Sequence, residues 1–217
     1  MAGSWEMRDS VVAATLHTDT TTMAWSLGLR KLQPYGMPIM ALAGMPYDMA
    51  RNVACMRALE HGFDWLFFLD SDVVPPPDAV PRLMAHRQPI VSGVYHRRSP
   101  PAGIPVMMKP VGQWLTRYPA NKVIEVDVVG AGCLLIHRDV LQNMPPQSPG
   151  RHWFDWRVDE KGLPTTTDER PPLSEDFTFC MWAKKHGYRI LVDTSVQCQH
   201  IGLAQASYAS FEPCTAM

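Results

Sequence analysis

The stretch WLFFLDSD, residues Trp65 to Asp72, decides the fold, because an apolar run leads directly into two carboxylates. The run from Trp65 to Leu69 predicts a strand that is buried on both faces, as found inside a parallel sheet. The prolines at 75–77 end this strand, because proline has no N–H group to donate to a neighbouring strand. Asp70 and Asp72 are therefore expected at the carboxyl end of a central strand, where open α/β sheets bind their ligands.

The two carboxylates of this stretch predict a divalent-metal site. In an extended segment, residues at i and i+2 point to the same face, so Asp70 and Asp72 would lie side by side. Unpaired, they would repel each other, and a bound cation removes that repulsion. A D-x-D triplet alone is weak evidence, since about one is expected by chance in such a chain. The alternative is a solvated turn in front of a helix that Asp78 caps.

Length and composition indicate one globular domain with a substantial core. The chain has 217 residues, of which 46% are hydrophobic and 19% are charged. The net charge of −1 argues against a surface that coats nucleic acid, although His96-Arg97-Arg98 forms a local basic patch. Membrane-length apolar runs and a signal-peptide pattern are both missing, so we expect a cytoplasmic protein. The five cysteines are unpatterned and predict reduced core residues.

Apolar periodicity and turn residues predict an α/β chain. The first third alternates strands and helices, with a strand at 10–16, a helix at 23–32, a strand at 38–43, a helix at 47–61 and a strand at 65–69. This order predicts crossover connections and a parallel sheet. Further along we expect a helix at 79–86, a strand at 89–95, a hairpin at 105–109 and 112–116, extended chain over 123–136 interrupted at 130–132, a helix over 177–186 that Ser174 caps, and strands at 189–193 and 196–201.

Two further segments each have two interpretations. Residues 142–172 lack periodicity and are long for a connection. Their aromatic residues Trp153, Phe154 and Trp156 either stack on a sugar or base, or fill the core from outside. Glu175 and Asp176 lie in the first turn of a predicted helix, where the helix dipole favours carboxylates, but a carboxylate there can also act as a base.

The order of these parts resembles the GT-A fold glycosyltransferases, in particular the inverting, family-2-like members, which move a sugar from a nucleoside diphosphate to an acceptor. The matching pieces cover residues 10–202 and are the N-terminal half, Asp70-Ser71-Asp72, Gly130-Ala131-Gly132 with the strand that follows, Ser174-Glu175-Asp176, and His200. Five motifs in the right order are more specific than any one of them. The resemblance implies a single GT-A-like (Rossmann-like) α/β domain over 1–217, with a mostly parallel central sheet flanked by helices.

The same resemblance implies a division of labour along the chain. Residues 10–100 would bind the nucleotide sugar, 101–202 would hold the acceptor and the catalytic base, and 203–217 would be a C-terminal tail. The implied metal ligands are Asp70, Asp72 and His200, and the implied catalytic residues are Asp176 as base and Glu175 as its neighbour. Contacts with the base, ribose or diphosphate are implied for Thr15, His17, Asp19, Arg51, Asn52, Asp70 and Ser71. The acceptor side is expected to include Gly130, Ala131, Gly132, Trp153 and Trp156.

The implied cofactor is Mn²⁺ or Mg²⁺, and the implied donor is a nucleoside-diphosphate sugar, with a UDP-sugar favoured. A divalent ion stabilises the charge that grows on the departing diphosphate, and oxygen ligands with one imidazole suit either metal. A general base for the acceptor hydroxyl contributes about 10²–10⁴-fold in rate. The acceptor stays open between a glycan, a lipid-linked sugar, a protein and a modified nucleobase, and the oligomeric state is open as well.

Other functions are weighed against this one. Asp70-Ser71-Asp72-Val73 also resembles the first motif of haloacid-dehalogenase-type phosphatases, where Asp70 would be the nucleophile and Asp72 the acid/base. In those enzymes the motif strand is usually the first, whereas here a β-α-β-α unit precedes it. A sugar-nucleotide pyrophosphorylase needs a glycine-rich phosphate loop, and residues 16–20 contain no glycine. A catalytically silent nucleotide- or glycan-binding module would keep Asp72 but would not need Asp176.

Overall fold

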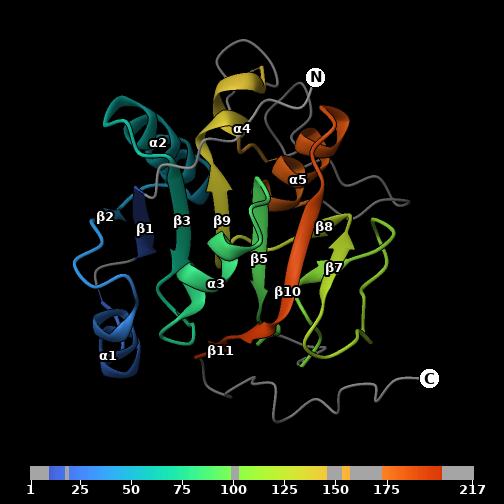
Figure 1. Cartoon of the computed structure of the whole chain (residues 1–217), viewed down its shortest axis with the longest axis horizontal. Helices are drawn as coiled ribbons and strands as arrows, with labels where there is room; N and C mark the ends of the chain where they lie inside the picture. The colour runs from blue at the N-terminus through green and yellow to red at the C-terminus, as the bar shows by residue number, and fades with distance from the viewer. Residues whose placement is uncertain (1–9, 18–19, 99–102, 146–152, 157–172, 202–217) are drawn as a thin grey trace.

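A seven-stranded mixed sheet forms the centre of the computed structural model, which describes residues 10–17, 20–98, 103–145, 153–156 and 173–201 (Figure 1). The strand order is β2-β1-β3-β9-β5-β10-β7. These strands are β1 (Val11–His17), β2 (Ile39–Ala43), β3 (Trp65–Asp70), β5 (Ile90–Val94), β7 (Val123–Val126), β9 (Cys133–His137) and β10 (Ile190–Gln197). All of them except β7 and β9 run in one direction, so the predicted α/β fold with a mostly parallel sheet is confirmed.

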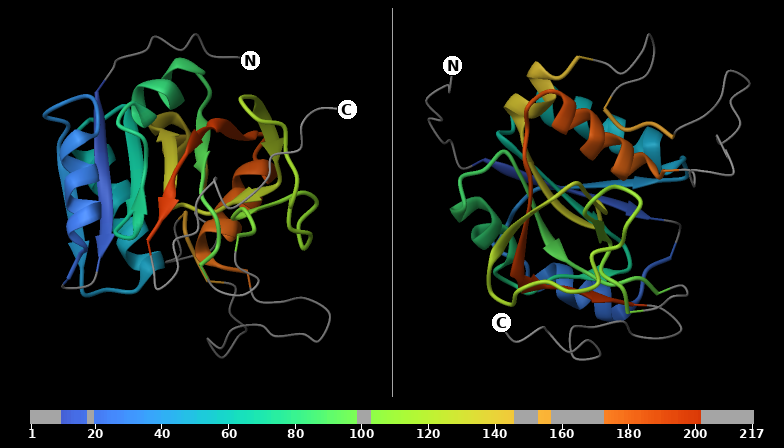
Figure 2. Two further views of the ribbon diagram at one scale, coloured as in Figure 1. Left: turned by 90° about the horizontal axis from the view of Figure 1, so that it is seen from below. Right: turned by 90° about the vertical axis from the view of Figure 1, so that its right-hand side faces the viewer.

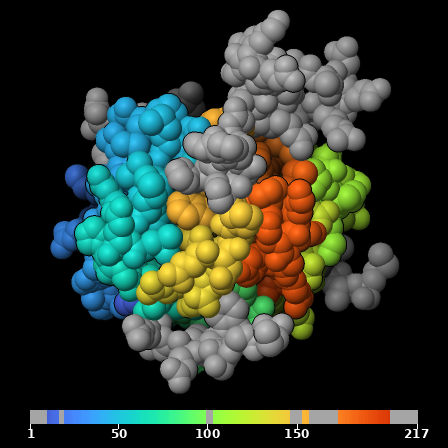
Figure 3. All heavy atoms as spheres, turned by 90° about the horizontal axis from the view of Figure 1, so that it is seen from above, coloured from blue at the N-terminus to red at the C-terminus, as the bar shows by residue number. Residues whose placement is uncertain are grey.

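Helices cover both faces of this sheet (Figure 2). They are α1 (Met23–Lys31), α2 (Tyr47–Glu60), α3 (Ala79–Ala85), α4 (Arg138–Asn143) and α5 (Glu175–Lys185). Because successive strand residues point to opposite faces, Leu66 and Phe68 pack with α2, α4 and α5, whereas Trp65 and Phe67 pack with α1 and α3. Figure 3 shows α4, in yellow, between α2 and the orange segment that carries α5. The result is a three-layer arrangement in which the sheet is the middle layer.

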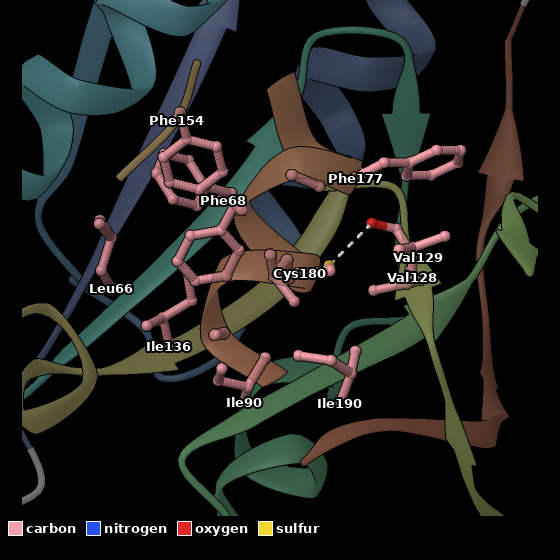
Figure 4. Packing of buried hydrophobic residues seen from close by; sticks show 14 of the residues in the cluster. Leu66, Phe68, Ile90, Val128, Val129, Ile136, Phe154, Phe177, Cys180 and Ile190 are labelled. Carbon is pink, nitrogen blue, oxygen red and sulfur yellow. Dashed lines mark hydrogen bonds between the residues drawn. The ribbon is translucent and has the colours of Figure 1, made fainter. Parts of the chain in front are cut away.

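Strand β3 is central because it is apolar on both sides. It lies between β1 and β9, and its residues 65–69 are all buried, as predicted. On the face that α5 covers, Phe68 packs beside Phe154, and the Cys180 thiol donates to the main-chain oxygen of Val129 at 3.5 Å (Figure 4). The four described cysteines are free and buried, which confirms that prediction.

The helix ends follow the local sequence signals only in part. The Thr22 side chain accepts from the Trp25 N–H and caps α1. Gly62 and Gly187 follow the ends of α2 and α5 with φ of +75° and +86°, a conformation that glycine adopts without strain. Ser174 precedes α5, but its hydroxyl donates to the Asp176 carboxylate rather than accepting from a main-chain N–H.

Several predicted element boundaries are corrected. The chain from Asp70 does not stay extended, because β3 ends there and residues 71–72 form a turn. The two strands expected at 189–193 and 196–201 are one strand, β10, followed by β11 (Gln199–His200) paired with β4 (Val73–Val74). The hairpin expected at 105–109 and 112–116 is present in part, because Met108 forms an antiparallel bridge with Trp114 and the Leu115 N–H donates to the Met107 oxygen at 3.1 Å. The first arm contains β6 (Met107–Met108), which also pairs with β8 (Val128–Val129).

Some predictions fall outside the described residues. They concern the side chain of His17, Asp19, the tail over 203–217 and most of the segment 142–172. Within the described part of the chain, no helix has the length and apolar character needed to cross a membrane.

Candidate functional site

The candidate site lies where the parallel strands end, at the lower edge of the sheet in Figure 1. Asp70 closes β3, and its main-chain N–H donates to the Gly132 oxygen at 3.2 Å, which brings the segment before β9 alongside. The Trp25 indole of α1 donates to the Asp70 main-chain oxygen at 2.9 Å. The carboxyl end of β3 is thus held from two sides, as the position of a ligand site in an open α/β sheet requires.

Arg51 is the hub of a buried charge cluster. This α2 residue is only 2% exposed, and its guanidinium group contacts Asp70 Oδ1 and Glu175 Oε1, each at 3.1 Å. Burial alone lowers the pKa of Arg51, but the carboxylates of Asp70, Glu175 and Asp176 raise it beyond its usual value. One guanidinium therefore joins a residue at the end of β3 to residues at the start of α5, and it stays charged.

The two acids at the start of α5 differ in their surroundings. Burial, and then the neighbouring Asp176, raise the pKa of Glu175 to about 7, although Arg51 opposes the shift. Asp176 Oδ1 accepts from the Phe177 N–H at 2.8 Å and from the Ser174 hydroxyl, whereas Oδ2 accepts from the Ala131 N–H at 3.1 Å. A carboxylate oxygen has two lone pairs. In the contacts with described residues, Oδ2 uses one of them for the Ala131 N–H and has the other left for a further partner. Both acids lie in the first turn of α5, as predicted, and both are buried, so the helix-dipole interpretation and a role as a base stay compatible with the structure.

Asp72 lies in the turn after β3 and faces two cationic or potentially cationic side chains. Its Oδ2 is 2.6 Å from Arg98 Nη2, and its Oδ1 is 3.4 Å from His200 Nε2. Burial raises the pKa of Asp72, but His200 and Arg98 outweigh this and lower it below the usual value. Asp70 and Asp72 therefore have separate counter-charges, and the expected shared face is wrong because the turn at 71–72 separates them.

One ring nitrogen of His200 faces the main chain, and the other faces Asp72. Its Nδ1 lies 2.7 Å from the main-chain oxygen of His96, which can only accept, so we assign the ring proton to Nδ1. In the neutral ring the lone pair of Nε2 then points toward Asp72, and metal-binding histidines commonly donate their other N–H in this way. Two facing acceptors, Nε2 and Asp72 Oδ1, form a pair that a cation would stabilise.

The fit of a divalent cation to this pair can be judged from the donor set. The described residues contain no group of three or more His, Cys, Asp or Glu that could hold a metal ion. A cation at Asp72 and His200 would therefore have two protein ligands and would take the others from water or substrate phosphates, as Mg²⁺ commonly does. The donor set fits a cation that arrives with a diphosphate, and Asp70 is committed to Arg51 instead.

Other predicted site residues lie in different surroundings. Thr15 is buried within β1, and the Ser71 N–H donates to the Leu16 oxygen. The Asn52 side-chain amide donates to the Phe154 oxygen at 2.7 Å, and its oxygen accepts from the Trp153 and Phe154 N–H groups. Contacts of Arg51, Asn52 and Thr15 with a nucleotide stay predictions, and the structure shows these side chains holding the protein itself.

The aromatic residues of the 142–172 segment divide between the two interpretations. Phe154 is 1% exposed and stacks on Phe179 with ring centres 4.5 Å apart, so it fills the core. The Trp153 indole donates to the Leu141 oxygen at 2.9 Å and packs against the same core. Trp156, 37% exposed, is the aromatic of this group that is available to a ligand.

A pocket of about 430 Å³ lies between α1 and the β4/β11 ribbon, but it is not this site. It is lined by Val74 and Gln199, which are cross-strand partners and therefore share one face of the ribbon. Their neighbours Val73 and His200 belong to the other face. The pocket lining includes neither Asp72 nor His200.

The sequence analysis missed two residues at the site. Arg98 was noted as part of a basic patch, but no local pattern joins it to Asp72, 26 positions earlier. The Tyr95 hydroxyl accepts from the Gly132 N–H at 3.1 Å, and its ring packs edge-on against His200 with centres 5.3 Å apart. Their positions at and just after the end of the predicted strand 89–95, at the same edge of the sheet, are the signal that could have found them.

Gly130 provides a test of how tightly this edge is packed. A β-carbon at Gly130 would lie 2.0 Å from the Tyr95 hydroxyl oxygen and 2.7 Å from Val106 Cγ1. We expect Gly130→Ala to lower the free energy of unfolding by about 1–3 kcal/mol through overpacking, measured by urea denaturation. Adding Tyr95→Phe removes the nearest atom and should restore part of the loss. A Gly130→Ala variant as stable as the parent would contradict this packing.

Comparison with known proteins gives a structural likeness but no sequence match. Neither a protein-family model nor a curated protein matches the chain. The crystal structure of A197 from STIV superposes with a TM-score of 0.57 at 18% identity, over 88% of this chain and 86% of that chain. This chain shares the A197 fold. At this identity the likeness to A197 extends to the fold alone.

Two weaker structural likenesses concern enzymes of sugar nucleotides or glycosylation. A glycosyltransferase involved in the glycosylation of the major capsid of PBCV-1 gives a TM-score of 0.34 at 14% identity, over 61% of each chain. Apo UDP-glucose pyrophosphorylase gives 0.43 at 8% identity, over 88% of this chain and 76% of that chain. Both scores are too low to carry an argument, so the function is argued from the site.

Proposed function

We propose that this protein is a metal-dependent glycosyltransferase that moves a sugar from a nucleoside-diphosphate sugar to an acceptor hydroxyl with inversion. The observation that carries the proposal is the meeting, at one sheet edge, of an aspartate that faces a histidine, and of a buried carboxylate. The pair is Asp72 and His200, and the carboxylate is Asp176, held against the segment before β9 by the Ala131 N–H. A leaving diphosphate needs the positive charge of a cation held by the pair, and an acceptor hydroxyl needs a carboxylate that takes its proton.

Asp176 is proposed to take the acceptor proton at Oδ2. The acceptor oxygen attacks the anomeric carbon as the bond from that carbon to the diphosphate oxygen breaks, and the nucleoside diphosphate leaves with the electron pair. The Ala131 N–H and the two donors on Oδ1 fix the orientation of the carboxylate. Attack from the side opposite the leaving group inverts the configuration at the anomeric carbon.

Asp72 and His200 would hold the divalent ion, Mn²⁺ or Mg²⁺, which supplies positive charge for the diphosphate when it is bound. Arg51 keeps Asp70 and Glu175 in place through contacts of 3.1 Å, and it does so from the protein interior. Trp156 is the candidate platform for a sugar ring or acceptor, because its side chain is partly exposed.

Thermal unfolding with nucleotides tests this proposal. UDP, GDP, CDP and dTDP would each be added with and without Mn²⁺. A ligand at 100-fold over its Kd adds about 2.7 kcal/mol, and in a domain of this size each kcal/mol raises the unfolding midpoint by about 2–4 °C. We expect a rise with one nucleotide, UDP being favoured, that depends on Mn²⁺.

The control variants separate a site effect from a general one. Asp72→Asn should remove the metal-dependent rise. Asp78→Asn changes an aspartate that also pairs with an arginine, Arg82 at 3.5 Å, and should keep the rise. No midpoint shift with any nucleotide, or an equal shift in Asp72→Asn, would count against the transferase.

The phosphatase alternative loses support from the topology. The motif strand β3 is third in chain order, behind β1, α1, β2 and α2, and Glu175 and Asp176 begin a helix instead of ending a strand. Asp70, the nucleophile in that interpretation, has one carboxylate oxygen held by Arg51. Hydrolysis of p-nitrophenyl phosphate that is lost in Asp70→Asn would favour the phosphatase.

A further inference from the structure

Arg98 reaches from the end of β5 to the candidate cation-binding pair. Its Nη2 lies 2.6 Å from Asp72 Oδ2, and its Nη1 donates to the main-chain oxygen of Ile201 at 2.9 Å. Ile201 directly follows His200, so Arg98 contacts both of the chain segments that carry the pair. The Arg98 side chain is 41% exposed and lies outside the apolar core, so it can change partners without disturbing the packing.

Asp72 lies close to a second carboxylate, that of Asp70. Asp70 is close enough that Asp72 contributes to raising the pKa of Asp70, after burial. Arg51 cannot serve both, because its guanidinium group is committed to Asp70 and Glu175. Apart from His200 when its ring is protonated, the positive charge beside Asp72 comes from Arg98, at 2.6 Å, or from a bound cation.

We propose that Arg98 and a divalent cation compete for Asp72, and that Arg98 passes to the diphosphate of the donor when the cation binds together with it. This inference rests on the proposed function. A cation between Asp72 and His200 would stand next to the guanidinium group, and two positive charges at that distance repel. The planar guanidinium fork suits phosphate oxygens, which are two-pronged acceptors like a carboxylate.

The exchange makes cation and diphosphate bind as a unit. A cation that arrives alone displaces Arg98 and leaves it without a phosphate to contact. A cation that arrives with a diphosphate brings phosphate oxygens, and these can accept from Arg98 once Arg98 has left Asp72. Binding of the cation should thus be weak alone and stronger with a diphosphate, and Arg98 should be the residue that sets this difference.

Titration of the full chain with Mn²⁺ tests the exchange, with free Mn²⁺ measured by its electron paramagnetic resonance signal. The second probe is inorganic pyrophosphate, which carries the diphosphate whatever the nucleotide base. Arg98→Gln should bind Mn²⁺ alone about two- to fivefold more tightly, as expected from losing an exposed ion pair that competes. With saturating Mn²⁺, it should bind pyrophosphate about tenfold more weakly or worse, because a charge-assisted contact is lost.

A matched control is Arg189→Gln. Arg189 also pairs with a carboxylate at the surface, that of Glu125 at 2.8 Å. It precedes β10, whereas His200 follows β10, so the Arg189 pair lies at the opposite end of this strand from the candidate site. Arg189→Gln should change neither the affinity for Mn²⁺ nor the affinity for pyrophosphate. Arg98→Lys keeps the charge without the fork and should lie between the parent and Arg98→Gln. Equal unfolding midpoints of the variants in EDTA would confirm that folding is intact.

The outcomes distinguish this inference from the function on which it rests. The exchange is wrong if Arg98→Gln leaves the affinities for Mn²⁺ and pyrophosphate unchanged, or if it weakens the binding of Mn²⁺ added without pyrophosphate. If Asp72→Asn abolishes Mn²⁺ binding in the same experiments, the metal site stands. If Asp72→Asn also leaves Mn²⁺ binding unchanged, the metal site is wrong and the proposed function fails with it.

Discussion

Replacing Arg51 by methionine is expected to lower the free energy of unfolding by about 3–5 kcal/mol, because it leaves buried carboxylates without their counter-charge. Arg51 and Glu175 are 2% and 5% exposed, so water cannot compensate for the lost contacts. Methionine keeps much of the length and apolar stem of arginine, which limits any packing loss. Urea denaturation followed by circular dichroism would measure the change.

The effect of Arg51→Met should also depend on pH. Glu175 has a raised pKa of about 7 in the folded protein, so the folded state binds its proton more tightly than the unfolded state. The contribution of this group to stability is therefore full below the unfolded pKa and is lost as the pH rises through about 7. Without Arg51 the pKa of Glu175 rises further, and the loss of stability should grow between mildly acidic and mildly alkaline pH.

Two further variants make the Arg51 prediction specific. Arg189→Met removes an exposed partner of Glu125 and should cost no more than about 1 kcal/mol. Adding Glu175→Gln to Arg51→Met removes one unpaired charge and should recover part of the loss. A loss below about 1 kcal/mol in Arg51→Met would contradict a buried hub. If Arg51→Met does not fold, Arg51→Lys keeps the charge but not the fork and should give a smaller, measurable loss.

Asp176→Asn is expected to lower the rate of transfer by about 10²–10⁴-fold, because the amide cannot accept the acceptor proton. Binding of the metal and nucleotide should persist, since Asp72 and His200 lie on other segments, in the turn before β4 and in β11. The release of UDP from UDP-glucose, with water as acceptor, is a readout that needs no knowledge of the natural acceptor. Donor binding would be followed separately by thermal unfolding.

Controls for Asp176→Asn must account for its structural contacts. Ser174→Ala removes the hydroxyl that donates to Asp176 Oδ1 but leaves the carboxylate, so it should lower stability and leave most of the transfer. Loss of transfer with unchanged donor binding in Asp176→Asn alone supports the base. Unchanged transfer would remove Asp176 from the mechanism, and a parent protein that binds the donor without any turnover would indicate a silent binding module.

The candidate site was predictable from the sequence where chemistry and local order coincide. Asp72 follows a buried strand, and the late histidine His200 was tied to it only through the family resemblance; the structure places them 3.4 Å apart. Asp176 and the segment at 130–132 were assigned to one side of the site, and the Ala131 N–H does contact the carboxylate of Asp176. Their catalytic and metal-binding roles stay proposals.

The expectations for Arg51 and Asn52 show where local reasoning stops. Both were expected at the nucleotide only because the family resemblance implied it. The structure uses Arg51 to join Asp70 and Glu175, the latter 124 positions away, and Asn52 to hold the main chain at Phe154. The sequence shows which hydrogen-bond donors Arg51 and Asn52 carry. Which acceptors they meet depends on how α2 packs against α5 and the rest of the fold.

The sequence by itself determined most of the strands and helices around the central sheet and the sheet edge at which the chemistry gathers. It did so because burial on both faces of Trp65 to Leu69, the helix caps and the glycine stops are properties of neighbouring residues. Only the tertiary structure decided that Arg98 meets Asp72, that Phe154 fills the core, and that Asp70 belongs to Arg51. Those pairings depend on the order of β3, β9, β5 and β10 across the sheet, and long-range strand order is not encoded in any local pattern.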